Sequence, residues 1–383
     1  MTSKINALTG SGGVAIEGDS SGILEFQSNG TTVMTVSSAS QTALNKIING
    51  NMLVAQYGTT GTAVAGGSYL ACDRWKAWEA SDAAVTVSQE TDGPTGQFIK
   101  CLKYNITTAD ASIGAAQFGM VRQMIEGQNI IDLGFGTASA QSVTISFWVK
   151  SSLTGSHGGA LNNGNEDRSY PFAYTVSSAN TWEYKTVTIP GDTSGTWDTD
   201  TTAGMIITFG LGTGTTYQGT ADAWQAGNKF QPSGTIQNIG TISNWNVTGV
   251  QLEAGVNATD FENLQFTNQL QLCQRYYYKS YAQDSGTVPL TSSGWLGSRH
   301  GIAYQTNNVG MDVRYPVVMR SSPSVTIYHQ DGTSAHIYEI ITGGKKGITG
   351  VQYGNDSGVW NITGGFLTVN YHYYFQIVAV SEL

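Results

Sequence analysis

Residues 142–152 read SVTISFWVKSS, and this stretch decides the fold class. Apolar residues stand at every second position, in alternation with polar residues and one tryptophan, Trp148. A period of two is the spacing of one face of a β-strand, so the stretch predicts a half-buried strand with the apolar face Val143, Ile145, Phe147 and Val149. Trp148 lies on the opposite face, where it would line a shallow groove of the sheet or pack beneath a loop.

The stretches that follow carry the same signal. Residues 182–197 read WEYKTVTIPGDTSGTW, in which the alternation runs to Ile189 and the turn residues Pro190-Gly191-Asp192 end the strand. Further strands are expected at residues 203–211 and 245–252. Short strands joined by long polar loops indicate a jelly-roll-like β-sandwich, to which we assign residues 45–263.

The N-terminal residues 1–44 carry shorter strand signals and form a β-rich segment in our interpretation. Apolar residues stand two apart at Leu24 and Phe26 and at Met34 and Val36, and Asn29-Gly30 between them predicts a hairpin turn. The segment has too few apolar residues to fold alone. We therefore expect it to pack against the next domain or to intertwine with copies from other chains.

A short linking helix is expected within residues 264–283. Thr267 is a good N-cap residue, and Leu270, Cys273 and Tyr277 follow it at the spacing of one helical face. Three consecutive tyrosines, residues 276–278, cannot share one face of a helix. We expect them to contact the sandwich, the C-terminal domain and a neighbouring chain.

The last residues, 284–383, predict a smaller C-terminal β-sandwich domain. Residues 366–380 read FLTVNYHYYFQIVAV, which indicates a long terminal strand or strand pair. The predicted fold class is therefore all-β, with a jelly-roll-like sandwich between two smaller β regions and one linking helix.

Composition excludes several classes of function. Only 12% of residues are charged and 48 are glycine, which suits an all-β chain with many tight turns. The formal net charge of −9, without a stripe of lysine or arginine, argues against nucleic acid as a partner. Three widely spaced cysteines indicate no disulfide framework. No secretion signal and no apolar run of membrane-spanning length is visible, so we expect no membrane insertion.

Neutral polar loops that also carry aromatic residues are the best candidates for a binding site. A sugar ring is held with its apolar face on an aromatic side chain while amides and hydroxyls satisfy its hydroxyl groups. We take four aromatic residues in or beside such loops as candidate carbohydrate-binding residues: Trp182, Trp197, Tyr217 and Trp224. Packing over an edge of the sandwich is the alternative for each of them.

Metal and catalytic chemistry have weaker signals. Asn165, Glu166 and Asp167 lie in an oxygen-rich loop and are candidate ligands of a structural Ca²⁺, with a plain solvated loop as the alternative. Apart from that ion we expect no cofactor. Asp198 and Asp200 are the best local pair of carboxylates for cleaving a glycosidic bond, but aspartate after turn residues ordinarily bonds its own backbone. We therefore expect no catalytic residue and no enzymatic activity.

Several strings, in this order, resemble phage tail fibres and related virion proteins. They are NKIINGNMLVAQYG, CDRWKAW, VTISFWVKSS, TWEYKTVTIPGDTSGTW, VQLEAG and LQLCQRYYYKS. The N-terminal text EGDSSGILEFQSNGTT is similar to a segment common in phage fibre proteins, which implies that residues 1–44 are a fibre or virion-attachment segment. In that group a strand reading roughly V-Q-L-E-x-G closes a carbohydrate-binding-module-like sandwich, and a helix reading L-x-L-C-Q-R-Y-Y leads into the distal part.

The resemblance implies a tail fibre or receptor-binding virion protein that adsorbs to host surface polysaccharide without catalysis. It also implies a homotrimer, other phage tail or virion proteins as partners, and assembly in the host cytoplasm into the virion. The group supplies no defined set of binding residues, so none is transferred. Two alternatives remain: a purely structural virion component such as a head fibre, decoration or tail adaptor, and, less favoured, a glycan depolymerase.

Overall fold

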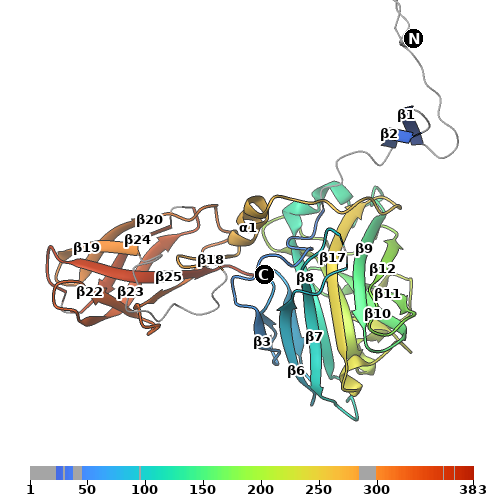
Figure 1. The fold of residues 1–383 in the computed structure, drawn as a ribbon, viewed down its shortest axis with the longest axis horizontal. Coiled ribbons are helices and arrows are strands. Elements are labelled where there is room, and N and C mark those ends of the chain that lie inside the picture. Colours follow the sequence, from blue (N-terminus) through green and yellow to red (C-terminus); the bar gives the residue numbers. More distant parts are fainter. Residues whose placement is uncertain are drawn as a thin grey trace, which may run out of the picture. The chain divides into compact units, whose positions relative to one another are not determined.

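The computed structural model describes residues 23–28, 31–37, 45–94, 96–283, 299–356, 358–365 and 367–383. These residues form an almost entirely β structure, as predicted (Figure 1). The chain divides into two units, residues 1–44 and 45–383. In the first unit β1 (Ile23–Ser28) pairs antiparallel with β2 (Thr31–Ser37), and Ser28 stands opposite Thr31. The predicted turn at Asn29-Gly30 lies outside the described residues.

Two antiparallel sheets make up the larger part of the second unit. The seven-stranded sheet runs, in spatial order, β15 (Gln225–Ala226), β11 (Arg168–Val176), β10 (Gly155–Asn163), β13 (Ala203–Thr213), β8 (Phe118–Glu126), β5 (Lys76–Glu79) and β4 (Ser68–Tyr69). The six-stranded sheet runs β12 (Glu183–Ile189), β9 (Val143–Ser151), β17 (Asn244–Ala254), β7 (Cys101–Thr108), β6 (Ala84–Glu90) and β3 (Thr60–Thr62). The apolar faces of these sheets meet in one core, which makes this part a β-sandwich.

The predicted alternation of residues 143–149 is confirmed in β9. Its four apolar residues are fully buried in the core of the sandwich. The ring of Phe147 packs against Phe209 of β13, in the other sheet, with ring centroids 5.0 Å apart. Phe209 in turn packs against Trp245 of β17 at 5.1 Å. Since burying one such side chain contributes about 1.5–3 kcal/mol, this layer of rings is a main source of the sandwich's stability.

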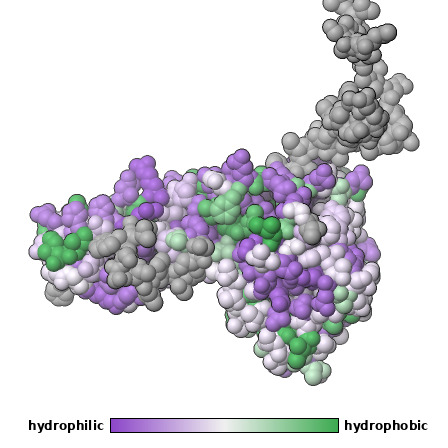
Figure 2. Space-filling view, viewed as in Figure 1, coloured by the Kyte–Doolittle hydropathy of each residue, from purple (hydrophilic) through white to green (hydrophobic). Residues whose placement is uncertain are grey.

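Short elements lie between the strands in the sequence. They are the 3₁₀ turns η1 (Gly127–Asn129), η2 (Ile131–Leu133), η3 (Thr215–Tyr217) and η4 (Asn238–Gly240), and the parallel pair β14 (Gln218–Gly219) and β16 (Gln231–Pro232). On the face shown in Figure 2, hydrophilic residues gather over the sandwich and apolar residues stand in small groups. No helix in the described ranges is long and apolar enough to cross a membrane.

The linking helix is shorter than predicted and begins earlier. Helix α1 spans Phe266–Gln274, and its N-cap residue is Gln265, which makes no side-chain cap. The prediction of Thr267 as the N-cap is wrong, because Thr267 already lies in the first turn of the helix. Tyr277, expected on the helix, belongs to strand β18 (Tyr277–Lys279), which ends the helix by pairing with the C-terminal strand.

The C-terminal strands close into a ring. β25 (His372–Val380) pairs with β19 (Arg299–Gln305), and the ring continues through β20 (Asn308–Val313), β24 (Gly358–Gly364), β23 (Lys345–Gly354) and β22 (His336–Glu339) back to β25. β18 and β21 (Ser324–Tyr328) pair with the end of β25. The domain is all-β, as predicted, but it is a barrel and not a sandwich, since β22 joins the two edges of the sheet.

The terminal strand is also shorter than its sequence pattern suggested. β25 begins only at His372. Residues 367–371 form a turn in which Asn370 adopts a positive φ of 66° and the Tyr371 amide donates to the carbonyl of Thr368. A backbone conformation of that kind is incompatible with an extended strand, so the alternation before His372 is not a strand signal.

The three consecutive tyrosines join the barrel to the sandwich. Tyr276 donates a hydrogen bond to Glu126 of β8, and the ring of Tyr277 contacts Tyr57 of the sandwich with centroids 3.9 Å apart. Tyr278 packs in the barrel against Tyr315 at 5.5 Å. All three are buried within the chain, so the structure leaves none of them for the expected contact with a neighbouring chain.

Candidate functional site

The outer face of the six-stranded sheet carries a groove whose floor is formed by β9 and β12. Tyr184 stands opposite Trp148, and Thr186 stands opposite Ser146, in the register of the two strands. These four side chains point away from the core because they alternate with the buried residues of each strand. The rings of Trp148 and Tyr184 lie 5.4 Å apart at 49°, and Tyr184 is 44% exposed.

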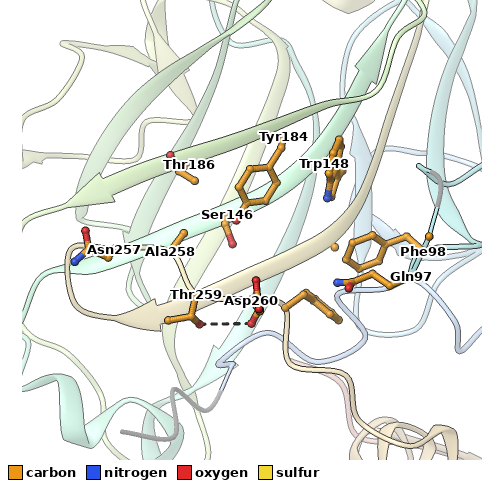
Figure 3. Close-up of a pocket in the computed structure, with 13 residues that line it drawn as sticks. Gln97, Phe98, Ser146, Trp148, Tyr184, Thr186, Asn257, Ala258, Thr259 and Asp260 are labelled. Carbon is orange, nitrogen blue, oxygen red and sulfur yellow. Dashed lines mark hydrogen bonds between the residues drawn. The ribbon is translucent and has the colours of Figure 1, made fainter. Parts of the chain in front are cut away.

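One wall of the groove depends on a glycine. Gly249 of β17 has a φ of +62°, and a Cβ there would lie 2.7 Å from the ring of Phe98. The bare backbone therefore lets the loop that precedes β7 lie on the sheet, with Phe98 beside Trp148 (Figure 3). Phe98 also packs edge-on against Phe261 with centroids 5.0 Å apart, and this contact joins the two loops that border the groove.

The opposite wall is the loop that follows β17, and the buried end of that strand holds it in place. Glu253 is fully buried, and its carboxylate accepts hydrogen bonds from the Thr259 amide at 2.9 Å and the Thr259 hydroxyl at 2.6 Å. Gln251, also fully buried, accepts a hydrogen bond from the Glu262 amide at 2.9 Å. In the string VQLEAG, the side chains of Gln251 and Glu253 therefore hold this wall of the groove in place.

The groove has a volume of about 680 Å³, which is within the range of sites that bind small molecules. Its polar lining residues are Gln97, Ser146, Thr186, Asn257, Thr259 and Asp260. Of these only Asp260 carries a charge, while Trp148, Tyr184 and Phe98 supply aromatic surface. Such a lining can bind a ring with one apolar face and several neutral hydrogen-bonding groups, whereas it offers little to a strongly charged ligand.

Of the four predicted aromatic residues, one stands beside this groove. Trp182 is two residues before Tyr184, and the ammonium of Lys150 lies 5.1 Å from the centre of its ring. Lys150 follows Trp148 by two residues on β9, so Trp182 continues the row of aromatic side chains along the same face. It does not line the groove itself.

The other three predicted residues pack elsewhere in the sandwich. The rings of Trp197 and Trp224 contact each other at 5.6 Å, and both contact Phe135. Trp197 is only 7% exposed. Tyr217 stacks on Phe230 at 4.7 Å, in a separate apolar cluster. The structure therefore does not bring the four together into one site, and their contact with a ligand stays a prediction.

The candidate calcium loop uses its side chains for internal contacts. Glu166 forms an ion pair with Arg122 at 2.7 Å and also accepts a hydrogen bond from Asn228. Asp167 accepts a hydrogen bond from Asn163 at 2.6 Å. Across the described ranges no cluster of three His, Cys, Asp or Glu residues has a metal-binding arrangement. A Ca²⁺ at Asn165, Glu166 and Asp167 stays a prediction.

The candidate catalytic pair stands apart from the groove lining. Asp200 accepts hydrogen bonds from the amide and the hydroxyl of Thr202, at 2.8 and 2.5 Å, and these bonds hold its pKa below the ordinary value. This is the bonding to nearby backbone expected of a turn aspartate. Asp198 precedes it on the same loop, and neither residue lines the groove.

The sequence patterns indicate only a small part of the groove. Alternation identifies Trp148 as an outward residue, and the alternation of residues 184–188 also places Tyr184 on that face, although Tyr184 was not predicted as a site residue. Phe98 and Asp260 lie in irregular loops, and nothing in the spacing of the chain indicates that the two loops meet.

Neither the protein-family models nor the curated proteins contain a match to this chain. Among solved structures it is similar to the enzymatically active domain of bacteriophage CBA120 tailspike protein 4, with a TM-score of 0.32 and 11% identity; the alignment covers 55% of this chain but only 22% of the tailspike chain. A putative sugar binding protein from Bacteroides thetaiotaomicron has the same TM-score and identity, with 55% of this chain and all of that chain covered.

A family 11 carbohydrate-binding module from Clostridium thermocellum, in complex with a β-1,3-1,4-mixed-linked tetrasaccharide, aligns with a TM-score of 0.26 and 12% identity. The alignment covers 52% of this chain and 99% of the module. TM-scores this low, at identities this low, establish no function for this chain.

Proposed function

We propose that this chain is a non-catalytic glycan-binding protein and that its binding site is the groove on β9 and β12. The observation that carries the proposal is the pair Trp148 and Tyr184, two outward aromatic rings on the floor of a neutral, hydroxyl- and amide-lined groove. An aromatic floor accepts the apolar face of a sugar ring, and the polar walls replace the water that its hydroxyl groups lose.

The ligand class in this proposal is a neutral saccharide. The groove lining holds one carboxylate, Asp260, and no cation. A carboxylate accepts hydrogen bonds from sugar hydroxyls but repels an anionic sugar. Glu253 and Gln251 fix the wall that carries Asp260, so little ordering is required on binding.

Binding by purified full-length chain tests the proposal. The probes are xylohexaose, maltohexaose and a mixed-linked β-glucan tetrasaccharide, and titration calorimetry measures their affinity. Replacing both Trp148 and Tyr184 by alanine is expected to weaken binding of the preferred probe by at least about tenfold. Ile242→Ala is the matched control, because Ile242 is 71% exposed and does not line the groove. Unchanged affinity in the double variant contradicts the proposal.

We further propose that the chain is a trimeric tail fibre or receptor-binding protein of a virion, which the resemblance in sequence supports. Weak sites on three chains would bind a surface polysaccharide with an avidity far above that of one site. Solution mass by light scattering tests the trimer, and a clean monomer contradicts it. Release of reducing ends from the probes, lost in Asp198→Ala or Asp200→Ala, would contradict the absence of catalysis.

A purely structural virion component is the second candidate, and one observation favours it. Trp197, Trp224 and Tyr217 all pack against other rings, as they would in a chain whose aromatic residues serve only stability. Immunogold labelling distinguishes the candidates: label on the capsid or neck favours the structural role, and label at the distal tail favours receptor binding.

A further inference from the structure

The C-terminal barrel has its own exposed tryptophan in a depression of its outer surface. Trp360 of β24 is 46% exposed, although the residue before it, Val359, and Ile362 are buried inside the barrel. The depression has a volume of about 590 Å³ and is lined by Trp360, Asp312, Arg314 and Asp356. It belongs to a different domain from the groove of the sandwich, so a ligand can bind there independently of the groove.

The backbone of the barrel is irregular at this tryptophan. On one side of β24, Gln352 and Tyr353 of β23 pair with Asn361 and Val359, so Trp360 is an extra residue on its strand. On the other side, β20 also shifts register between Gly310 and Val313. A β-bulge of this kind redirects a side chain and is frequent beside functional sites. Alternation points Trp360 outward after the buried Val359, and the extra residue moves the next inward position from residue 361 to Ile362.

A buried amide, that of Asn361, fixes the surface beside Trp360. Asn361 is only 6% exposed and donates hydrogen bonds to Asn308 at 3.0 Å and to Gln352 at 3.2 Å. Its carbonyl oxygen accepts one from the hydroxyl of Tyr304 at 3.3 Å. The ring of Tyr304, 55% exposed, lies on Gly310, where a Cβ would be 3.3 Å from it. Asn361 thus holds a second exposed aromatic ring one strand beyond β20.

The charges around Trp360 decide which kind of ligand fits. Asp312 and Arg314 form an ion pair at 3.2 Å, yet their side chains are 72% and 79% exposed. With Asp356 the lining contains two carboxylates and one guanidinium, so its local charge is negative and an anionic ligand is disfavoured. An apolar protein partner is disfavoured as well, because the centres of protein interfaces are depleted of charged residues. The hydroxyl groups of a neutral polyol can donate to a carboxylate and accept from a guanidinium.

We propose that the depression around Trp360 is a second saccharide-binding site, specific for neutral sugars, on the outer face of the barrel. A sugar ring lies on the indole of Trp360, its hydroxyl groups donate to Asp312 and Asp356, and the guanidinium of Arg314 donates to a ring or hydroxyl oxygen. Adjacent strands lie about 4.8 Å apart, and Tyr304 is two strands from Trp360, so the two rings are spaced to contact successive units of an oligosaccharide.

Four forms of the full chain test this site with the same three oligosaccharide probes: wild type, Trp360→Ala, the double variant Trp148→Ala with Tyr184→Ala, and the three substitutions together. The double variant is expected to retain binding of at least one probe, and adding Trp360→Ala is expected to weaken that binding by at least about tenfold. Trp360→Phe should keep most of the affinity, since it keeps an aromatic face. Ile341→Ala, at a 60% exposed position of another barrel loop, is the control.

The possible failures are distinguishable. If the double variant abolishes all binding and Trp360→Ala changes nothing, the barrel site is refuted and the groove stands. If Trp360→Ala abolishes binding and the double variant changes nothing, the barrel site stands and the groove is refuted. A change of solution mass in Trp360→Ala also overturns the barrel proposal, because the tryptophan would then lie in a contact between chains.

Discussion

Removing the partner of Arg74 should destabilise the protein strongly, because it leaves a buried charge unpaired. Arg74 is only 1% exposed; its guanidinium forms an ion pair with Glu382, donates to the carbonyl of Met124 at 2.7 Å and lies 3.5 Å from the centre of the Tyr276 ring. Arg74 precedes β5 of the sandwich, whereas Glu382 follows the last strand of the barrel. The pair therefore ties the end of the chain into the sandwich.

Glu382→Ala would leave the guanidinium buried without its carboxylate. Breaking a buried ion pair in this way costs about 3–5 kcal/mol, whereas an exposed pair is worth about 1 kcal/mol or less. The exposed pair of Lys46 with Asp132, whose side chain is 61% exposed, gives the matched control Asp132→Ala. Replacing both partners with apolar residues, Arg74→Met with Glu382→Leu, should recover most of the loss, because no charge is then left buried.

Denaturant unfolding followed by circular dichroism measures these free energies, and hydrogen exchange in β18 and β25 locates the loss. We expect Glu382→Ala to lower the free energy of unfolding by several times the effect of Asp132→Ala and to speed exchange in both strands. Equal losses in Glu382→Ala and Asp132→Ala would show that the buried pair contributes no more than the exposed pair. A double variant that is less stable than Glu382→Ala would show that the cost does not come from the unpaired charge.

Three further predictions concern a buried acid, a groove glycine and a turn. Burial raises the pKa of Asp73 to about 6, although Gln56 donates a hydrogen bond to its carboxylate. Since the ordinary pKa is about 4, the protonated form of Asp73 favours the folded state. This contribution to the free energy of unfolding, about 3 kcal/mol, is complete below about pH 4 and is lost as the pH rises through about 6. Unfolding free energy against pH should show this fall, and Asp73→Asn should flatten it; an unchanged slope contradicts the assignment. Gly249→Ala should lower the free energy of unfolding by at least about 1 kcal/mol and weaken glycan binding, because Gly249 has a positive φ and Phe98 occupies the space that the added methyl group needs. Wild-type affinity in this variant would contradict the role of Phe98 as a wall of the groove. Thr202→Val should bring the pKa of Asp200 back toward its ordinary value, because the variant lacks the hydroxyl group that donates to the Asp200 carboxylate. A carboxyl titration followed by NMR measures this pKa, and an unchanged pKa would contradict the prediction.

The regular parts of the fold were predictable because they follow from alternation alone. The all-β class and the strands β9, β13 and β17 depend on local patterns, which tertiary contacts reinforce. The pattern misled where the backbone turns: the residues before His372 alternate, yet Asn370 adopts a positive φ and the strand starts later. Closure of the barrel depends on pairing between β22 and β25, which no local pattern encodes.

The groove was predictable only in part. Trp148 could be placed on the outer face from its position between core residues, and Tyr184 follows the same rule on the neighbouring strand. The walls could not be placed, because they depend on Phe98 and Phe261 meeting across a large separation in sequence. Composition also favoured loop tryptophans such as Trp197, whereas the structure buries that ring in the sandwich core, since a large aromatic side chain gains more from burial than from exposure.

Glycan binding in the groove is tested most directly by a crystal structure of the chain grown with the oligosaccharide that it binds best. We expect a sugar ring over Trp148 and Tyr184, with hydroxyl groups within hydrogen-bonding distance of Thr186, Asn257 or Asp260. A saccharide bound at high occupancy anywhere else, with the groove filled only by water, would contradict it.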